Sequence, residues 1–104
     1  MSENHFTWTG YQSTESAHRL IIAYLTIDIQ KSPEGTMELL EKINAVRSKQ
    51  IPEWERIGNA YCLRLFPDFA EIEEDFAEEL GKVEQIPIAV FEAAVQSWQQ
   101  HITS

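Results

Sequence analysis

The sequence predicts an α+β fold, in which a small antiparallel sheet carries two packed helices in the order β-β-α-β-β-α. Three observations support this class: two stretches before residue 31 have strand-like composition, a hairpin pattern begins at Trp54, and two other stretches repeat apolar residues at helical spacing. The chain has 104 residues, of which 43% are apolar, as in one ordinary globular domain. We therefore expect residues 1–104 to form a single domain.

The first two predicted strands lie in the N-terminal third. Residues 5–11 alternate polar and aromatic side chains, which would place Phe6 and Trp8 on one face of a half-buried strand. Residues 19–30 (RLIIAYLTIDIQ) contain four isoleucines, whose branched side chains favour a second strand over a helix. A helix is the alternative for this second stretch, because apolar residues also recur there at helical spacing: Ala17, Leu20, Ile21, Tyr24 and Ile27.

A helix is predicted over about residues 32–49. Ser32 can cap free backbone N–H groups, Pro33 suits the first helical position, and Glu34 is favourable beside the positive end of the helix. Gly35 weakens this first turn, so a helix that starts at Thr36 is the alternative. The expected buried face consists of Thr36, Leu39, Leu40, Ile43 and Val46.

A hairpin with a defined register is predicted around the turn Phe66-Pro67-Asp68-Phe69, in which Pro suits the second position and Asp the third. If Phe66 lies opposite Phe69, apolar residues meet on one face, and Arg64 lies opposite a carboxylate on the other. A shift of one residue would destroy both features. The predicted pairs are Leu65 with Ala70, Arg64 with Glu71, Leu63 with Ile72, and Cys62 with Glu73.

The last predicted helix begins at Ile86-Pro87, because Pro again suits the first turn. All three tryptophans are expected in or against the core, and an exposed binding anchor formed by Trp54 and Arg56 is the alternative for one of them. The buried face of this helix is predicted from apolar residues at intervals of three or four: Ile88, Phe91, Val95, Trp98 and Ile102.

Acidic residues concentrate in one segment. Between Asp68 and Glu84 the chain carries eight carboxylates against one base, Lys82, so this segment holds seven of the nine net negative charges. The segment begins in a predicted strand and continues into a loop, and we expect a fixed anionic face instead of a disordered tail. Two interpretations are open: a solvated face that maintains solubility, or a docking surface for a basic protein partner, which would repel nucleic acid. The predicted partner-binding residues are Asp68, Glu71, Glu73, Glu74, Asp75, Glu78 and Glu79.

The sequence contains no recognisable catalytic, cofactor-binding or metal-binding motif. The three histidines, His5, His18 and His101, are scattered, and Cys62 has no second cysteine as a partner. The predicted register places Cys62 beside Glu73, which would raise the pKa of the thiol and disfavour a nucleophile. Phosphate-binding loops, calcium loops and nucleophile elbows do not occur in the sequence. We therefore expect a protein that is not an enzyme and that has no metal or cofactor.

The sequence also shows no targeting signal. The N-terminus MSENHFTWTG lacks the basic and long apolar regions of a secretion signal. The longest apolar run, residues 20–25, is far below the roughly 20 residues needed to cross a bilayer. A single cysteine excludes an internal disulfide. These features predict a cytoplasmic protein with no membrane interaction.

The C-terminal two thirds resemble a known group of proteins. Residues 54–63 (WERIGNAYCL), followed by an acidic hairpin arm and then by residues 88–98 (IAVFEAAVQSW), resemble small YacL-type bacterial proteins and related immunity proteins of contact-dependent growth inhibition. The resemblance covers about residues 37–102 and centres on the pattern W-x-R-x-G-x-x-Y-x-L. Immunity proteins bind and block a cognate toxin, often a basic nuclease, so the resemblance implies a toxin domain as partner. The alternative is a housekeeping or regulatory protein of unknown role, in which the acidic face serves only solubility.

Overall fold

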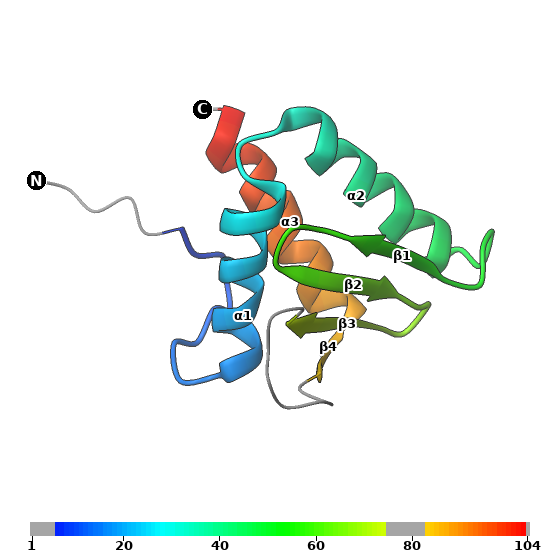
Figure 1. Ribbon diagram of the computed structural model, residues 1–104, viewed down its shortest axis with the longest axis horizontal. Helices are drawn as coiled ribbons and strands as arrows, with labels where there is room; N and C mark the ends of the chain where they lie inside the picture. Colours follow the sequence, from blue (N-terminus) through cyan, green and yellow to red (C-terminus); the bar gives the residue numbers. More distant parts are fainter. Residues whose placement is uncertain (1–5, 75–82, 104) are drawn as a thin grey trace, which may run out of the picture.

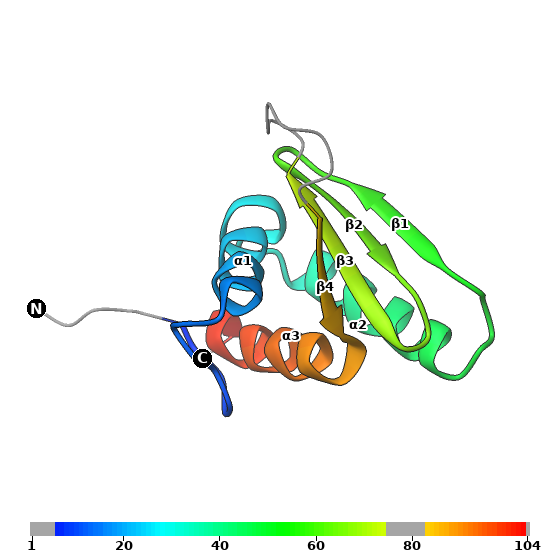
Figure 2. The same cartoon turned by 90° about the horizontal axis from the view of Figure 1, so that it is seen from below.

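The computed structural model describes residues 6–74 and 83–103, which form two layers: a four-stranded antiparallel sheet, in the order β1-β2-β3-β4, and helices packed on one of its faces (Figures 1 and 2). The predicted α+β class is confirmed. The predicted order β-β-α-β-β-α with two helices is wrong, because the described chain runs α-α-β-β-β-β-α with three helices. The elements are α1 (Ser16–Tyr24) with its continuation, the π-helix η1 (Leu25–Ile29), α2 (Pro33–Arg47), β1 (Trp54–Ile57), β2 (Tyr61–Leu65), β3 (Phe69–Glu74), β4 (Val83–Pro87) and α3 (Ile88–Thr103).

The core lies between the inner face of the sheet and the helices. Helix α3 packs against β3, β4 and α2, while α1 contacts β3 and β4, and α2 contacts β2. Each large apolar side chain buried in this way contributes about 1.5–3 kcal/mol before the entropy of ordering is subtracted. Every described helix and strand except β1 supplies such residues. Among them are Tyr24, Leu25, Leu39, Ile43, Leu63, Ile72, Ile86 and Phe91.

The first predicted strand is wrong. Residues 6–15 form turns and irregular structure, and His5 lies outside the described residues. The alternation nevertheless predicted burial, since Phe6 and Trp8 are 8% and 7% exposed. These rings pack on a helix instead of a strand: Phe6 meets Trp98 of α3 edge to face, with ring centroids 5.0 Å apart. The alternation of aromatic residues predicts that they are buried against an apolar surface. Here helices provide that surface, so residues 6–15 need not form a strand.

The second predicted strand, residues 19–30, is also wrong, and the helical alternative is correct. The cost of a β-branched residue in a helix is at most about 0.7 kcal/mol, less than the gain from burying one isoleucine. Tertiary packing therefore overrides the local preference. The helix ends in π geometry, in which the Gln30 N–H donates to the Leu25 carbonyl five residues earlier at 2.6 Å. The buried residues follow helical spacing: Ile21, Tyr24, Leu25, Asp28 and Ile29.

Helix α2 confirms the predicted start signal and buried face. The Ser32 hydroxyl accepts a hydrogen bond from the Gly35 N–H at 3.0 Å, and Pro33 is the first helical residue. This cap satisfies one of the N–H groups that a helix start leaves without an intrahelical partner. Four of the five predicted face residues are buried, and the fifth, Leu40, is half-buried against the core.

Strands β2 and β3 form the predicted hairpin, and all four predicted residue pairs are confirmed. The Phe66 N–H donates to the Phe69 carbonyl at 2.9 Å, and the two rings stack with centroids 4.8 Å apart. The apolar residues of the register face the core and are fully buried: Leu63, Leu65, Ala70 and Ile72.

The predicted start of the last helix is wrong, because Ile86-Pro87 belongs to strand β4 and α3 begins at Ile88. Strand β4 is at the edge of the sheet. Pro87 has no N–H group, and at an edge it need not break the hydrogen-bond ladder. Ile86 lies opposite Ala70 and is buried. The predicted buried face of α3 is otherwise correct, although Ile102 is only half-buried. No described helix is long and apolar enough to span a bilayer.

A buried carboxylate joins the helical layer to the sheet. Asp28, in η1, is 7% exposed, and its two carboxylate oxygens accept hydrogen bonds from the Ala60 N–H at 2.9 Å and the Tyr61 N–H at 3.0 Å. Gly58 precedes these residues in the turn between β1 and β2. A Cβ atom on Gly58 would lie 2.3 Å from Oδ2 of Asp28, so this position requires glycine if the carboxylate is to stay in place.

We expect Gly58→Ala to lower the free energy of unfolding by about 1–3 kcal/mol, because the added methyl group would displace a carboxylate that accepts two hydrogen bonds. Urea unfolding followed by circular dichroism measures this change. In an Asp28→Ala background the same Gly58→Ala substitution should cost less, since the clashing group has been removed. Equal costs in the two backgrounds would contradict this account of the turn.

Candidate functional site

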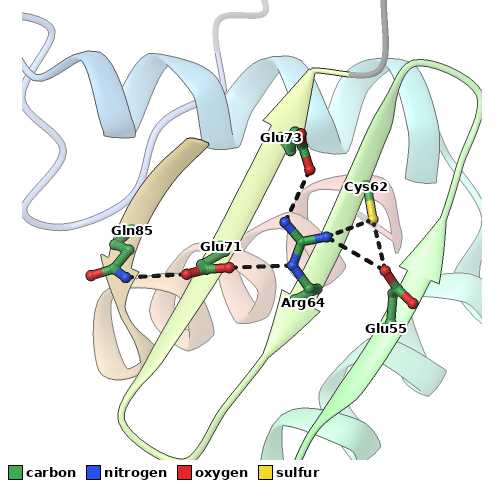
Figure 3. Close-up of polar contacts among 6 residues, drawn as sticks. All are labelled: Glu55, Cys62, Arg64, Glu71, Glu73 and Gln85. Carbon is green, nitrogen blue, oxygen red and sulfur yellow. Dashed lines mark hydrogen bonds and ion pairs between the residues drawn. The ribbon is translucent and has the colours of Figure 1, made fainter. Parts of the chain in front are cut away.

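The sheet face turned away from the helices carries a network of polar side chains (Figure 3). Alternation along the strands places it there, because the intervening residues of β2 and β3 point into the core. All helices lie on the other side of the sheet in Figure 2, so no described helix covers this face. We call these residues the open-face network: Glu55, Cys62, Arg64, Glu71, Glu73 and Gln85.

Arg64 is the centre of the open-face network. In the strand register it lies directly opposite Glu55 of β1 on one side and Glu71 of β3 on the other. Its Nε donates to Oε1 of Glu71 at 3.2 Å, and its Nη2 donates to Oε1 of Glu73 at 3.0 Å. Its Nη1 reaches Oε2 of Glu55 at 3.5 Å. One guanidinium therefore pairs with three carboxylates and reduces their mutual repulsion.

Two further contacts extend the network across all four strands. The side-chain amide of Gln85, in β4, donates to Oε2 of Glu71 at 3.1 Å. On the other side, the Cys62 thiol donates to Oε2 of Glu55 at 3.2 Å, and Arg64 Nη1 lies 3.4 Å from the Cys62 sulfur. The carboxylates are thus held in place by side chains on neighbouring strands.

The network shifts the pKa values of its central groups. Hydrogen bonding to Glu73 is the main cause of a raised pKa for Arg64, and burial opposes it. Burial, followed by the hydrogen bond to Glu55, raises the pKa of the Cys62 thiol to about 11, while the Arg64 charge opposes the rise. The predicted upward shift for Cys62 is confirmed, although Glu55 contributes more than Glu73 does. The thiol is protonated near neutral pH, which makes it a poor nucleophile.

The structure divides the predicted acidic surface between two faces of the sheet. Glu71 and Glu73 belong to the open-face network. Glu74 lies opposite Tyr61, whose side chain faces the helices, and therefore points to the helical side. Glu84 is also on that side, where its Oε2 accepts a hydrogen bond from the Ser16 hydroxyl at the start of α1 at 3.0 Å.

The remaining predicted residues lie away from the network or outside the described residues. Asp68 is in the turn between β2 and β3, and its backbone carbonyl accepts a hydrogen bond from the Ile88 N–H at 3.0 Å, which ties this turn to the start of α3. Asp75, Glu78 and Glu79 fall outside the described residues. The described part of the chain thus brings together two of the seven predicted partner-binding residues, Glu71 and Glu73.

The predicted hairpin register placed Cys62 and Arg64 beside Glu73 and Glu71, although neither was predicted as a binding residue. The prediction did not include Glu55 and Gln85 at all. Glu55 could have been found by reading residues 54–57 as a strand that returns antiparallel to β2 through a turn at Gly58, which places it opposite Arg64. Gln85 depends on β4, whose pairing with β3 across the intervening segment had no local sequence signal.

The network can offer acceptor atoms to a cationic group. Among hydrogen bonds between described residues, Oε1 of Glu55 and Oε2 of Glu73 accept none, while Arg64 occupies the space between the carboxylates. In residues 6–74 and 83–103 no group of three or more His, Cys, Asp or Glu side chains is placed to hold a metal ion. Ile57 lies opposite Cys62 on β1 and is 71% exposed, which adds an apolar contact beside the charges.

We expect the Cys62 thiol of the native protein to react with iodoacetamide with a midpoint near pH 11, and Glu55→Gln to lower this midpoint, because the substitution removes the carboxylate that accepts the thiol proton. The stability that accompanies the raised pKa is present below about pH 9, the ordinary value, and is lost as the pH rises through about 11. Alkylation rates measured as a function of pH, with circular dichroism to confirm folding, test this.

Glu53→Gln is the matched control for Cys62 reactivity, since it removes the same charge from an exposed residue outside the network. A midpoint near pH 9 in the wild-type protein, or the same shift in both variants, would contradict the expected role of Glu55.

No protein-family model, curated protein or solved structure matched this chain. The resemblance of residues 37–102 to YacL-type and immunity proteins therefore stays a prediction.

Proposed function

We propose that this protein is a cytoplasmic, non-enzymatic protein-binding protein, and that its open face binds a basic protein partner. The observation that carries the proposal is the arrangement of Glu55, Glu71 and Glu73 around one arginine on a sheet face that no described helix covers. Three carboxylates and one guanidinium leave this face with a net charge of about −2, in a chain whose overall net charge is −9.

The geometry favours binding because the carboxylates need little further ordering. Side chains on a paired strand that already accept hydrogen bonds lose less conformational entropy when a partner binds. Glu55 and Glu73 each retain one carboxylate oxygen without a hydrogen bond to a described residue. Lysine or arginine side chains of a partner can donate to these two oxygens, with Ile57 as an adjoining apolar contact.

The sharper form of the proposal is an immunity protein that neutralises a basic toxin domain. A nuclease must present cationic groups to bind nucleic acid, and a fixed acidic surface is complementary to such a site. Support comes from the charge of the open face and from the resemblance of residues 37–102 to immunity proteins. The same charge would repel nucleic acid itself, so a protein is the proposed partner.

The second candidate is a housekeeping or regulatory protein in which acidic residues serve only solubility. The division of the predicted acidic segment between two faces supports this candidate, because it lowers the charge gathered at any one surface. Glu84, for example, stabilises the start of α1 through Ser16 instead of facing a partner.

The double variant Glu55→Gln/Glu73→Gln tests the binding surface on a purified candidate partner, such as the basic domain of a toxin encoded beside this protein. Glu71 still pairs with Arg64 in this variant, so the fold should persist. We expect the association rate at low salt to fall about tenfold or more, measured by surface plasmon resonance. Raising the salt from 0.1 M to 1 M should also slow the association of the wild-type protein with its partner, because the Debye length falls from about 10 Å to about 3 Å.

The matched control is Glu38→Gln/Glu41→Gln, which removes two charges from the exposed side of α2. Equal losses in both double variants would indicate an effect of net charge alone, and binding that neither substitution nor salt changes would exclude the open face. A partner that binds but retains its toxic activity would exclude the immunity form while leaving a protein-binding function.

A further inference from the structure

A cavity of about 590 Å³ opens on the helical side of the molecule, where the N-terminal segment, α1, η1 and the C-terminal part of α3 meet. Figures 1 and 2 both place the N-terminal segment and α1 at one end of the molecule, with the sheet at the other. This cavity is therefore separate from the open-face network. Its volume is within the range of about 300–1,000 Å³ that is typical of small-molecule sites.

Aromatic side chains form the inner wall of the cavity. Phe6 and Trp98 are both buried and meet edge to face, and Tyr11 lines the cavity beside them. The Trp98 indole N–H donates to the Gln30 carbonyl at 2.9 Å, which fixes the orientation of the ring. These rings provide a rigid apolar wall suited to a flat ligand.

Basic side chains lie at the mouth of the same cavity. Arg19 and Lys31 both line it and are exposed, and neither forms an ion pair with a carboxylate of the described residues. Arg19 is oriented by a hydrogen bond from its Nη1 to the Ser13 carbonyl at 2.6 Å. Lys31 follows Gln30, whose φ of 59° turns the chain at the end of η1.

The charge of the lining is opposite to that of the chain. The sequence contains 17 acidic residues and 8 lysine or arginine residues, yet the described lining includes Arg19, Lys31 and His101 and no aspartate or glutamate. In a strongly acidic protein, this selection lowers the repulsion that an anion meets at the cavity. The hydroxyl of Thr26, which also lines the cavity, supplies a further donor.

We propose that this cavity binds a small organic anion with a flat apolar body, whose carboxylate, sulfonate or phosphate group pairs with Arg19 and Lys31. The apolar body would stack against Phe6 and Trp98, while the anionic group stays at the mouth of the cavity. The proposal is independent of the open face, and the two sites can be tested separately.

The test compares two probes with nearly the same ring system, anilinonaphthalene sulfonate, which is anionic, and N-phenylnaphthylamine, which is neutral. We expect the sulfonate to bind the native wild-type protein saturably with one-to-one stoichiometry, measured by isothermal titration calorimetry, and to quench tryptophan fluorescence. The affinity of the neutral amine should be lower by about tenfold or more, because the amine cannot pair with the two cations.

Three variants assign the probe to this cavity. Arg19→Gln/Lys31→Gln should weaken sulfonate binding by about tenfold or more, and Thr26→Trp should abolish binding by filling the cavity while it leaves both charges in place. Lys49→Gln is the control for the loss of a positive charge, since Lys49 is exposed beyond the other end of α2, about 20 Å of helix away from Lys31.

The proposal fails if the sulfonate does not bind saturably at millimolar concentration, or if the neutral probe binds equally well. It also fails if folded Arg19→Gln/Lys31→Gln or folded Thr26→Trp binds the sulfonate as tightly as the wild-type protein does. Loss of partner binding in the open-face variant Glu55→Gln/Glu73→Gln, with sulfonate binding unchanged, would support two separate sites.

Discussion

The rest of the structure depends on the buried carboxylate of Asp28. A buried charge is costly unless hydrogen bonds satisfy it, and here two backbone N–H groups of the turn between β1 and β2 do so. This contact joins η1 to the sheet, and it requires a residue without a side chain at Gly58. It holds η1 against the turn between β1 and β2, while the buried apolar residues of β2 and β3 select the face that the helices cover.

Because the helices cover one face of the sheet, the alternation of side chains along each strand determines whether a charged side chain projects toward the helices or from the uncovered face. Arg64, Glu71 and Glu73 project from the uncovered face, where they pair with one another and with Glu55. Glu84 projects to the helical side and accepts a hydrogen bond at the start of α1. The described residues of this acidic segment thus include two members of the open-face network and one contact at the start of α1.

The two proposed sites have opposite charge because they are built from different layers. The sheet presents carboxylates held by a single arginine, while the cavity between α1, η1 and α3 presents two bases around aromatic rings. The ligand proposed for the open face is a basic protein, and the ligand proposed for the cavity is a small organic anion. Both sites use side chains that neighbouring residues already orient, which reduces the entropy lost on binding.

The sequence by itself determined the features in which two local signals agree. The register of β2 and β3 was predictable because charge pairing and apolar pairing select the same alignment, and α2 was predictable because a Ser32 cap precedes a periodic apolar face. Only the tertiary structure decided the conformation of residues 19–30, since their isoleucines favour a strand by less than the free energy gained on packing as a helix. It also decided that Gln85 belongs to the open-face network, because Gln85 reaches Glu71 only through the pairing of β4 with β3, which no local pattern specifies.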